Sequence, residues 1–273
     1  MRSARTLAVA MAFAFGLACS QASQGASAGG PRIEAIQKRG TLRVAVLAEY
    51  PWLTAPADGG QNFGGPAWQL VQAIAARLGV RIEPVPVRFE DKVAVLSRDA
   101  ADLTAAPMLV TPARTAQADL VAYSVSAQCF FGRADDARFS QARTIDDLDR
   151  PDVTVAVITG TPAEGWLAKR IPSAKQRVIP GSGADIPVDE VTSGRADAAT
   201  IDKFFVAALL KQSPGLATLP RGAECLASHE MEIPVGIAIA KGQPAFLELL
   251  QATAREAMPD IKAEEAKVLS GGP

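Results

Sequence analysis

Histidine and cysteine are scarce in this chain of 273 residues, which holds one His (His229) and three Cys. Most zinc sites and Ser/His or Cys/His relays need more of these side chains than the chain supplies. Lys and Arg number 28 against 29 Asp and Glu, so the net charge of −1 argues against a nucleic-acid partner, which selects for a basic face. No nucleotide-binding or metal-binding motif stands out, and we therefore expect no cofactor and no metal site.

Long apolar runs are also missing, apart from one short stretch near the start. Two arginines precede the uncharged run Leu7–Ala18, which is well short of the roughly 20 residues that a membrane span needs. A basic start, a short apolar centre and small residues after it are typical of a secretory signal peptide, which we predict over residues 1–28. Ala26-Ser27-Ala28 fits a cleavage site. Leu17-Ala18-Cys19 is similar to a lipoprotein site with its leucine one place too close, so a soluble periplasmic product and a lipid anchor both stay open.

Export changes the interpretation of the two cysteines that remain in the mature chain, Cys129 and Cys225. Two thiols in an oxidising compartment favour a disulfide, and two separate buried thiols are the alternative. Because the closed loop would be long, the bond would contribute about 4–5 kcal/mol in the chain-entropy description. We assign neither cysteine to catalysis.

Strand and helix signals alternate along the mature chain. The apolar residues 42–47 predict a strand, and Pro66 opens a helix with one apolar face that Gly79 closes. Two prolines place the next strand, 82–87, at the edge of a sheet. Such alternation predicts an α/β fold with a largely parallel sheet.

The pattern begins again near the middle of the chain, which predicts two lobes. Lobe 1 is expected to comprise residues 29–125 and 233–273, and lobe 2 residues 126–232. Two long extended segments, 121–131 and 229–240, would connect the lobes as a hinge that the chain crosses twice.

Two short segments carry the most chemical information, Thr111-Pro112-Ala113-Arg114 and Thr161-Pro162-Ala163-Glu164. Each places Thr at the N-cap and Pro at the first position of a helix just after a strand, and Glu164 predicts a capping box. The unpaired N–H groups and partial positive charge of a helix start attract anions. Arg114 adds a planar fork that can hold a carboxylate with two bonds. The alternative is that both are ordinary caps and Arg114 is a surface charge.

Three further side chains follow strands, where open α/β sheets bind ligands. Asp202 is placed to cap the following helix or to serve as the counter-charge of an ammonium group. Tyr50 and Trp52 are placed to stack on a ligand or to belong to the core. Glu49 and Glu90 are acids on the same flank, to which we assign no role.

The order of these motifs resembles the family 3 extracellular solute-binding proteins, the polar amino-acid receptors of ABC importers. The resemblance covers most of the mature chain, and although each motif is short, their shared order is specific. The matching motifs are Gly40–Val46, Gly65, Ala76–Val80, Ala101–Leu103, Thr111–Arg114, Tyr123–Ser124, Gly160–Thr161, Gly194–Ala198, Asp202 and Val235–Ile239.

The resemblance implies a two-lobed periplasmic binding protein fold, with two mixed sheets flanked by helices and joined by a two-strand hinge. Such a protein would close over a small-molecule ligand as a monomer and deliver it to an inner-membrane ABC permease. In the family, the equivalents of Arg114 and Thr161 bind the ligand's α-carboxylate, and the equivalent of Asp202 binds its α-ammonium. An aromatic after the first strand covers the ligand's side chain, which points to Tyr50 or Trp52.

The chain departs from the family at positions that face the ligand. The family commonly has serines or threonines before the Thr-x-x-Arg turn, whose hydroxyls and carbonyls hold the amino group, whereas this chain has Ala106-Pro107-Met108-Leu109-Val110. Leu109 stands where a hydroxyl would contact the ligand, which indicates a more apolar pocket. The C-terminal region is also expected to lack the usual final helix, because the tail 264–273 offers little to bury.

Three functions are compatible with this sequence. A binding protein without catalysis would capture an amino-acid-like or carboxylate ligand with an apolar part. A dehydratase-like enzyme on the same fold would need a buried general acid, for which Glu49 and Asp202 are the candidates. An accessory or sensory protein would use the two-lobed body to contact a membrane partner.

Overall fold

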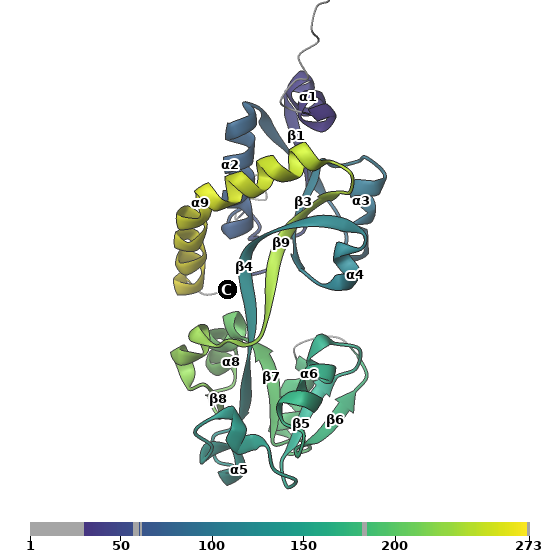
Figure 1. Ribbon diagram of the computed structural model, residues 1–273. Helices are drawn as coiled ribbons and strands as arrows, with labels where there is room; N and C mark the ends of the chain where they lie inside the picture. Colours follow the sequence, from purple (N-terminus) through teal and green to yellow (C-terminus); the bar gives the residue numbers. More distant parts are fainter. Residues whose placement is uncertain (1–29, 57–59, 61, 182–184, 272–273) are drawn as a thin grey trace, which may run out of the picture.

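The computed structural model describes residues 30–56, 60, 62–181 and 185–271, and Figure 1 shows that they form two lobes connected by two long strands. The predicted signal peptide and the possible lipid anchor at Cys19 lie outside the described residues. Within the described part of the chain, no helix has both the length and the apolar character to cross a membrane.

Lobe 1 contains a parallel arrangement in which β1 (Thr41–Val46) lies between β2 (Arg81–Pro86) and β3 (Leu103–Leu109). The strand β2 forms the edge of the sheet, as its two prolines predicted. The helices of this lobe are α1 (Gly30–Arg39), α2 (Pro66–Leu78), η1 (Phe89–Asp91), α3 (Ala94–Ser97), α4 (Pro112–Thr115) and α9 (Pro244–Gly271).

Lobe 2 repeats the parallel arrangement, with β5 (Thr154–Ile158) between β6 (Lys175–Ile179) and β7 (Ala198–Asp202). A short strand that the sequence did not predict, β8 (Leu216–Leu219), pairs with the hinge strand β4. Its helices are α5 (Ala137–Ser140), η2 (Ile145–Leu148), α6 (Pro162–Arg170), α7 (Asp185–Thr192), η3 (Lys203–Phe205), α8 (Val206–Gln212) and η4 (Gly222–Ala227).

The two long strands that connect the lobes are β4 (Ala118–Arg133) and β9 (Glu230–Ala240), and they pair antiparallel along most of their length (Figure 1). β9 also pairs with β3 of lobe 1, and β4 also pairs with β7 of lobe 2, so the strand order is β2-β1-β3-β9-β4-β7-β5-β6. The two-lobed α/β fold and its two-strand hinge are confirmed, but the hinge strands join the two expected sheets into one continuous sheet. The sheet is mixed, because the hinge strands run antiparallel to their neighbours.

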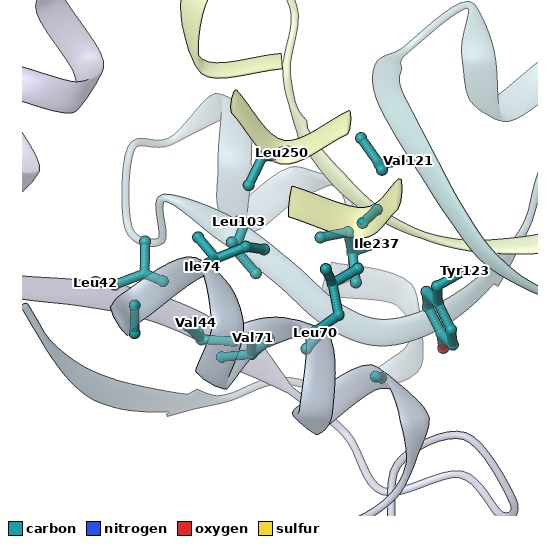
Figure 2. Close-up of a cluster of buried hydrophobic side chains, with 14 of the residues drawn as sticks. Leu42, Val44, Leu70, Val71, Ile74, Leu103, Val121, Tyr123, Ile237 and Leu250 are labelled. Carbon is teal, nitrogen blue, oxygen red and sulfur yellow. The ribbon is translucent and has the colours of Figure 1, made fainter. Parts of the chain in front are cut away.

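The buried apolar side chains form separate clusters in the two lobes. The main cluster of lobe 1 packs α2 against β1, β3, β9 and α9, and it includes the fully buried Leu42, Ile74 and Ile237 (Figure 2). The main cluster of lobe 2 includes Phe130 and Leu167. The lobe boundaries at residues 125/126 and 232/233 stay a prediction.

The C-terminal region differs from the expectation, because α9 is a helix of 28 residues. It is bent in Figure 1, and the internal Pro259 gives a physical reason, since proline removes one backbone N–H and clashes with the preceding turn. Beyond the proline, Ile261 is buried and Glu265 accepts a hydrogen bond from Ser124 of β4. The tail therefore packs against the hinge, a long-range contact that the local composition does not reveal.

A disulfide joins Cys129 of β4 to Cys225 of η4, with 5.9 Å between their Cα atoms. Both residues are fully buried in lobe 2. The predicted pairing is confirmed, and the alternative of two free thiols is excluded.

We expect the double variant Cys129→Ala/Cys225→Ala to unfold at lower denaturant, because the 96-residue separation of the cysteines makes the constraint on the unfolded chain large. The expected loss is about 4 kcal/mol in free energy of unfolding. Urea titrations of the oxidised protein, the reduced protein and the variant measure it. Equal midpoints for the oxidised protein and the variant would contradict the expectation.

Candidate functional site

Arg114 lies just past the carboxyl end of β3, on the one-turn helix α4. Thr111 caps this turn by accepting a hydrogen bond from the Arg114 backbone N–H at 3.4 Å, and Pro112 takes the first helical position, as predicted. The guanidinium donates to the carbonyl oxygen of Leu109 at 3.1 Å, and burial lowers its pKa. Because α4 has a single turn, its dipole contributes little, and the guanidinium carries the positive charge on this side.

Lys92 and Glu49 form a second charged group on lobe 1, which sequence reasoning did not identify. Lys92 is 4% exposed, and its ammonium donates to the Glu49 carboxylate and to the carbonyl oxygen of Pro107 at 3.0 Å. Burial lowers the pKa of Lys92, and the neighbouring Glu49 opposes that change. Phe89 is 61% exposed, and the Lys92 ammonium lies 4.5 Å from the centre of its ring. The sequence predicts only a short helix from Lys92 to Leu96, and this local pattern gives no cue to the contact.

On lobe 2, Thr161 begins α6 with Pro162 at the first helical position, as predicted. The predicted capping box is wrong. The Thr161 hydroxyl donates to the Ile158 carbonyl oxygen at 2.7 Å instead of accepting from the helix, and the Glu164 carboxylate accepts from Gly160 N–H at 2.8 Å. The glycine, with a φ of 73°, turns the chain so that its own amide reaches the carboxylate.

Asp202 ends β7 and caps η3, accepting from the Phe204 backbone N–H at 3.0 Å and from the Ser126 hydroxyl. Burial raises the pKa of the Asp202 carboxyl, while these hydrogen bonds and the Lys203 cation act in the opposite direction. The helix-capping alternative is therefore confirmed, and the role toward a ligand stays a prediction.

Tyr50 and Trp52 each contact an aromatic ring of lobe 2. Trp52 meets Phe204 edge to face with 5.6 Å between ring centres, and Tyr50 meets Phe205 at 6.0 Å. The Trp52 indole N–H donates to the Ser124 hydroxyl at 3.2 Å. Both residues are partly exposed and take part in the contact between the lobes, and Trp52 also packs against the main apolar cluster of lobe 1.

A cavity of about 220 Å³ lies where lobe 1, the hinge and lobe 2 meet. Its wall is mostly apolar, and its polar side chains are uncharged. It is lined by Leu109, Ser126, Gln128, Ala156, Val157, Ile158, Thr161, Pro162, Ala163, Pro187, Thr200, Met231 and Ile233. Of the seven predicted site residues, Leu109 and Thr161 line this cavity, and Asp202 adjoins it through Ser126.

The remaining predicted residues do not line this cavity. Tyr50, Trp52, Thr111 and Arg114 are half-buried like the other three, and they follow β1 and β3 at the edge of the lobe 1 sheet that carries Leu109. Their assignment to a ligand stays a prediction. In the described residues, no group of three or more His, Cys, Asp or Glu side chains is arranged to hold a metal ion.

The comparison with protein families identifies the bacterial extracellular solute-binding proteins, family 3, whose model matches residues 42–267. An ancestral cationic amino acid solute binding protein is 28% identical, with a TM-score of 0.62 over 88% of this chain and 98% of that one. An ancestral amino acid-binding protein, described as a precursor of cyclohexadienyl dehydratase, is 29% identical, with a TM-score of 0.59 and the same coverage.

A longer protein is also similar to this chain. Membrane-bound lytic murein transglycosylase F from Cronobacter sakazakii is 30% identical over 196 residues, which are 68% of this chain. The match spans 36% of that relative's length, so this chain corresponds to about a third of it.

The raised pKa of Asp202 predicts how stability depends on pH. The folded state binds the carboxyl proton more tightly than the unfolded state does, so this contribution favours folding below the ordinary pKa of about 3.9 and is lost as pH rises through the raised value. Asn keeps the cap and the acceptor oxygen but does not ionise. We expect Asp202→Asn to gain stability relative to the wild type across that window, by about 1.4 kcal/mol per unit of raised pKa.

Urea unfolding of both proteins at a series of pH values between about 3 and 7 measures this difference. Comparing the two proteins at each pH cancels the titration of the other acids. The expectation is contradicted if the difference in free energy of unfolding stays constant with pH, or if the wild type gains stability relative to the variant as pH rises. Asp202 would then ionise at least as readily in the folded state as in the unfolded chain.

Proposed function

The chain belongs to the bacterial extracellular solute-binding proteins, family 3, and we propose that it captures a small organic ligand between its two lobes for an inner-membrane ABC permease. The cavity between Leu109, the hinge strands and the start of α6 carries this proposal, because it is bordered by both lobes. Closure of the lobes would bury a ligand there, and the binding contacts to both sides would stabilise the closed state.

The proposed ligand is an amino acid or another carboxylate with an apolar part. Arg114 would bind the carboxylate, since among the described residues its guanidinium donates one hydrogen bond, to the Leu109 carbonyl oxygen, and has further N–H donors. Thr161 at the start of α6 would supply amides to the same group, and Asp202 would accept from an amino group. Leu109 and the apolar wall would contact the ligand's side chain, and Tyr50 and Trp52 would cover it.

We place the mature protein in the periplasm as a monomer, either soluble or lipid-anchored at Cys19. Family membership and the disulfide support an exported, oxidising environment. An accessory role beside a membrane partner would use the same ligand-dependent closure, and the likeness to part of a membrane-bound transglycosylase motivates it.

A dehydratase-like activity is the second candidate. Two observations favour it: the likeness to a protein described as the precursor of a dehydratase, and the buried Asp202 with its raised pKa, which is the property of a general acid. Nuclear magnetic resonance spectra of a candidate compound, recorded over time in the presence of the protein, distinguish binding from catalysis. Binding leaves the compound intact, whereas catalysis converts it at a rate that Asp202→Asn abolishes.

We expect Arg114→Ala to weaken binding by about 2–3 kcal/mol, because the ligand's carboxylate would lose its charged donor. Mass spectrometry of the denatured wild-type protein would identify a co-purified compound, and a thermal-shift screen of amino and organic acids would provide one otherwise. Calorimetric titration of that compound into wild type and variant measures the loss.

Arg88→Ala is the matched control, because the Arg88 side chain is 83% exposed on the same lobe. It should bind as the wild type does. Equal affinity of the Arg114→Ala variant and the wild type would remove Arg114 from the site.

A further inference from the structure

Lobe 1 lacks the hydroxyl groups that are expected to hold an amino group beside the carboxylate site. The end of β3 reads Ala106, Pro107 and Leu109, and the two carbonyl oxygens nearest to the site are already used, Pro107 by Lys92 and Leu109 by Arg114. Each carbonyl oxygen keeps one lone pair, but an α-ammonium has three N–H donors, and a carboxylate is a stronger acceptor for them than a neutral carbonyl.

Glu49 offers such an acceptor. It follows β1 at the edge of the sheet where β3 also ends, because β1 and β3 are parallel. Its side chain is 31% exposed, and Lys92 binds its Oε2 atom. A carboxylate has about four lone-pair sites, and among the described residues its other oxygen, Oε1, receives no hydrogen bond.

Lys92 holds this carboxylate in position. The ammonium is itself nearly inaccessible, with a side chain that is 5% exposed, and it is fixed between Glu49 and the Pro107 carbonyl oxygen. A buried lysine with two fixed acceptors does not move freely, so the carboxylate that it binds is held against the end of β3. Lys92 thus acts as a positioning residue for a carboxylate that is about a third exposed.

Arg114 is close enough to Glu49 for the two charges to interact. Glu49 raises the pKa of Arg114 against the effect of burial, and the Arg114 cation lowers the pKa of Lys92. Arg114 and Glu49 therefore present one charge of each sign on lobe 1. Such a pair complements the carboxylate and the ammonium of a zwitterion, whereas a simple carboxylate would match only the cation.

On the basis of the proposed binding function, we infer that Glu49, held by Lys92, accepts a hydrogen bond from the α-ammonium of an amino-acid ligand on lobe 1. Glu49 replaces the missing hydroxyls, and Asp202 approaches the same ammonium from lobe 2 when the lobes close. The site therefore selects amino acids over the same acids without an amino group.

Calorimetry with L-phenylalanine and 3-phenylpropanoate tests this inference, because the two compounds differ by the α-amino group and carry the apolar part that suits the cavity. If a thermal-shift panel of amino acids favours another one, that amino acid and its desamino analogue replace the pair. We expect Glu49→Gln to weaken binding of the amino acid by about tenfold or more, and binding of the desamino acid by less than about threefold.

Glu90→Gln is the matched control, because the Glu90 side chain is 69% exposed on the same lobe, in η1. It should leave both affinities unchanged. Circular dichroism checks that Glu49→Gln is folded. If it is not, Glu49→Asp replaces it, because this variant keeps the charge and is expected to retain more of the preference for the amino acid than Glu49→Gln.

The outcomes separate the inference from the proposed function. Suppose that the wild type binds the amino acid, but that Glu49→Gln weakens binding of both compounds equally or changes neither affinity. This result overturns the role of Glu49 and leaves the binding function intact. Wild-type protein that binds the desamino acid as well as the amino acid also overturns it. If the wild type binds no amino acid in the panel, both the inference and the proposed amino-acid ligand are wrong.

Discussion

The antiparallel pairing of β4 with β9 is the interaction on which the rest of the structure depends, because these two strands belong to the sheets of both lobes. Their approach requires a glycine at one point. A Cβ atom on Gly236 would lie 2.7 Å from the carbonyl oxygen of Val121, closer than any side chain tolerates. The register shifts between Ala122 and Ser124 and again between Ser126 and Gln128. Such irregularities increase local twist and bending, and here they fall where the chain passes between the lobes.

Side-chain contacts beside the hinge connect the lobes without fixing them. The two aromatic pairs, Trp52 with Phe204 and Tyr50 with Phe205, are each worth about 0.5–1.5 kcal/mol beyond their buried area. Micromolar binding supplies about 8 kcal/mol, so a ligand can rearrange these pairs. The Trp52 indole is also tied through Ser124 to Glu265 on α9. Hydrogen bonds through Ser124 therefore link this loop to the C-terminal helix, and the ring contacts link it to lobe 2.

The features that local sequence determines were predictable. The bounds of α2 follow from Pro66 at its start and from Gly79, whose φ of 69° suits glycine at a helix end. The turn that carries Arg114 and the start of α6 follow from the same logic. Predicting the two-lobed fold required the order of many motifs along the chain, and predicting the disulfide required the inference that the protein is exported. Each of these rests on signals within a few residues or on composition.

The features that depend on distant parts of the chain were not predictable. Lys92 gains its role because β1 and β3 bring Glu49 and Pro107 together, and the three residues are far apart in sequence. The continuation of α9 to Gly271 depends on a contact between Glu265 and the hinge. The Glu164 carboxylate accepts a hydrogen bond from the amide of Gly160 and not from that of Thr161, because Gly160 adopts a positive φ. A glycine in the sequence permits this conformation but does not require it.

The apolar end of β3 is compatible with a charged site because the backbone, and not the side chains, positions the cations. Lys92 and Arg114 bind the carbonyl oxygens of Pro107 and Leu109 at 3.0 and 3.1 Å. These carbonyls lie two residues apart on one strand, so they point the same way and set the spacing of the two cations. A side chain at 106, 107 or 109 can then change from hydroxyl to apolar without displacing either cation. The backbone of β3 thus positions the cations, while its side chains set the polarity of the cavity wall. In the proposed function, this apolar wall would select the ligand's side chain.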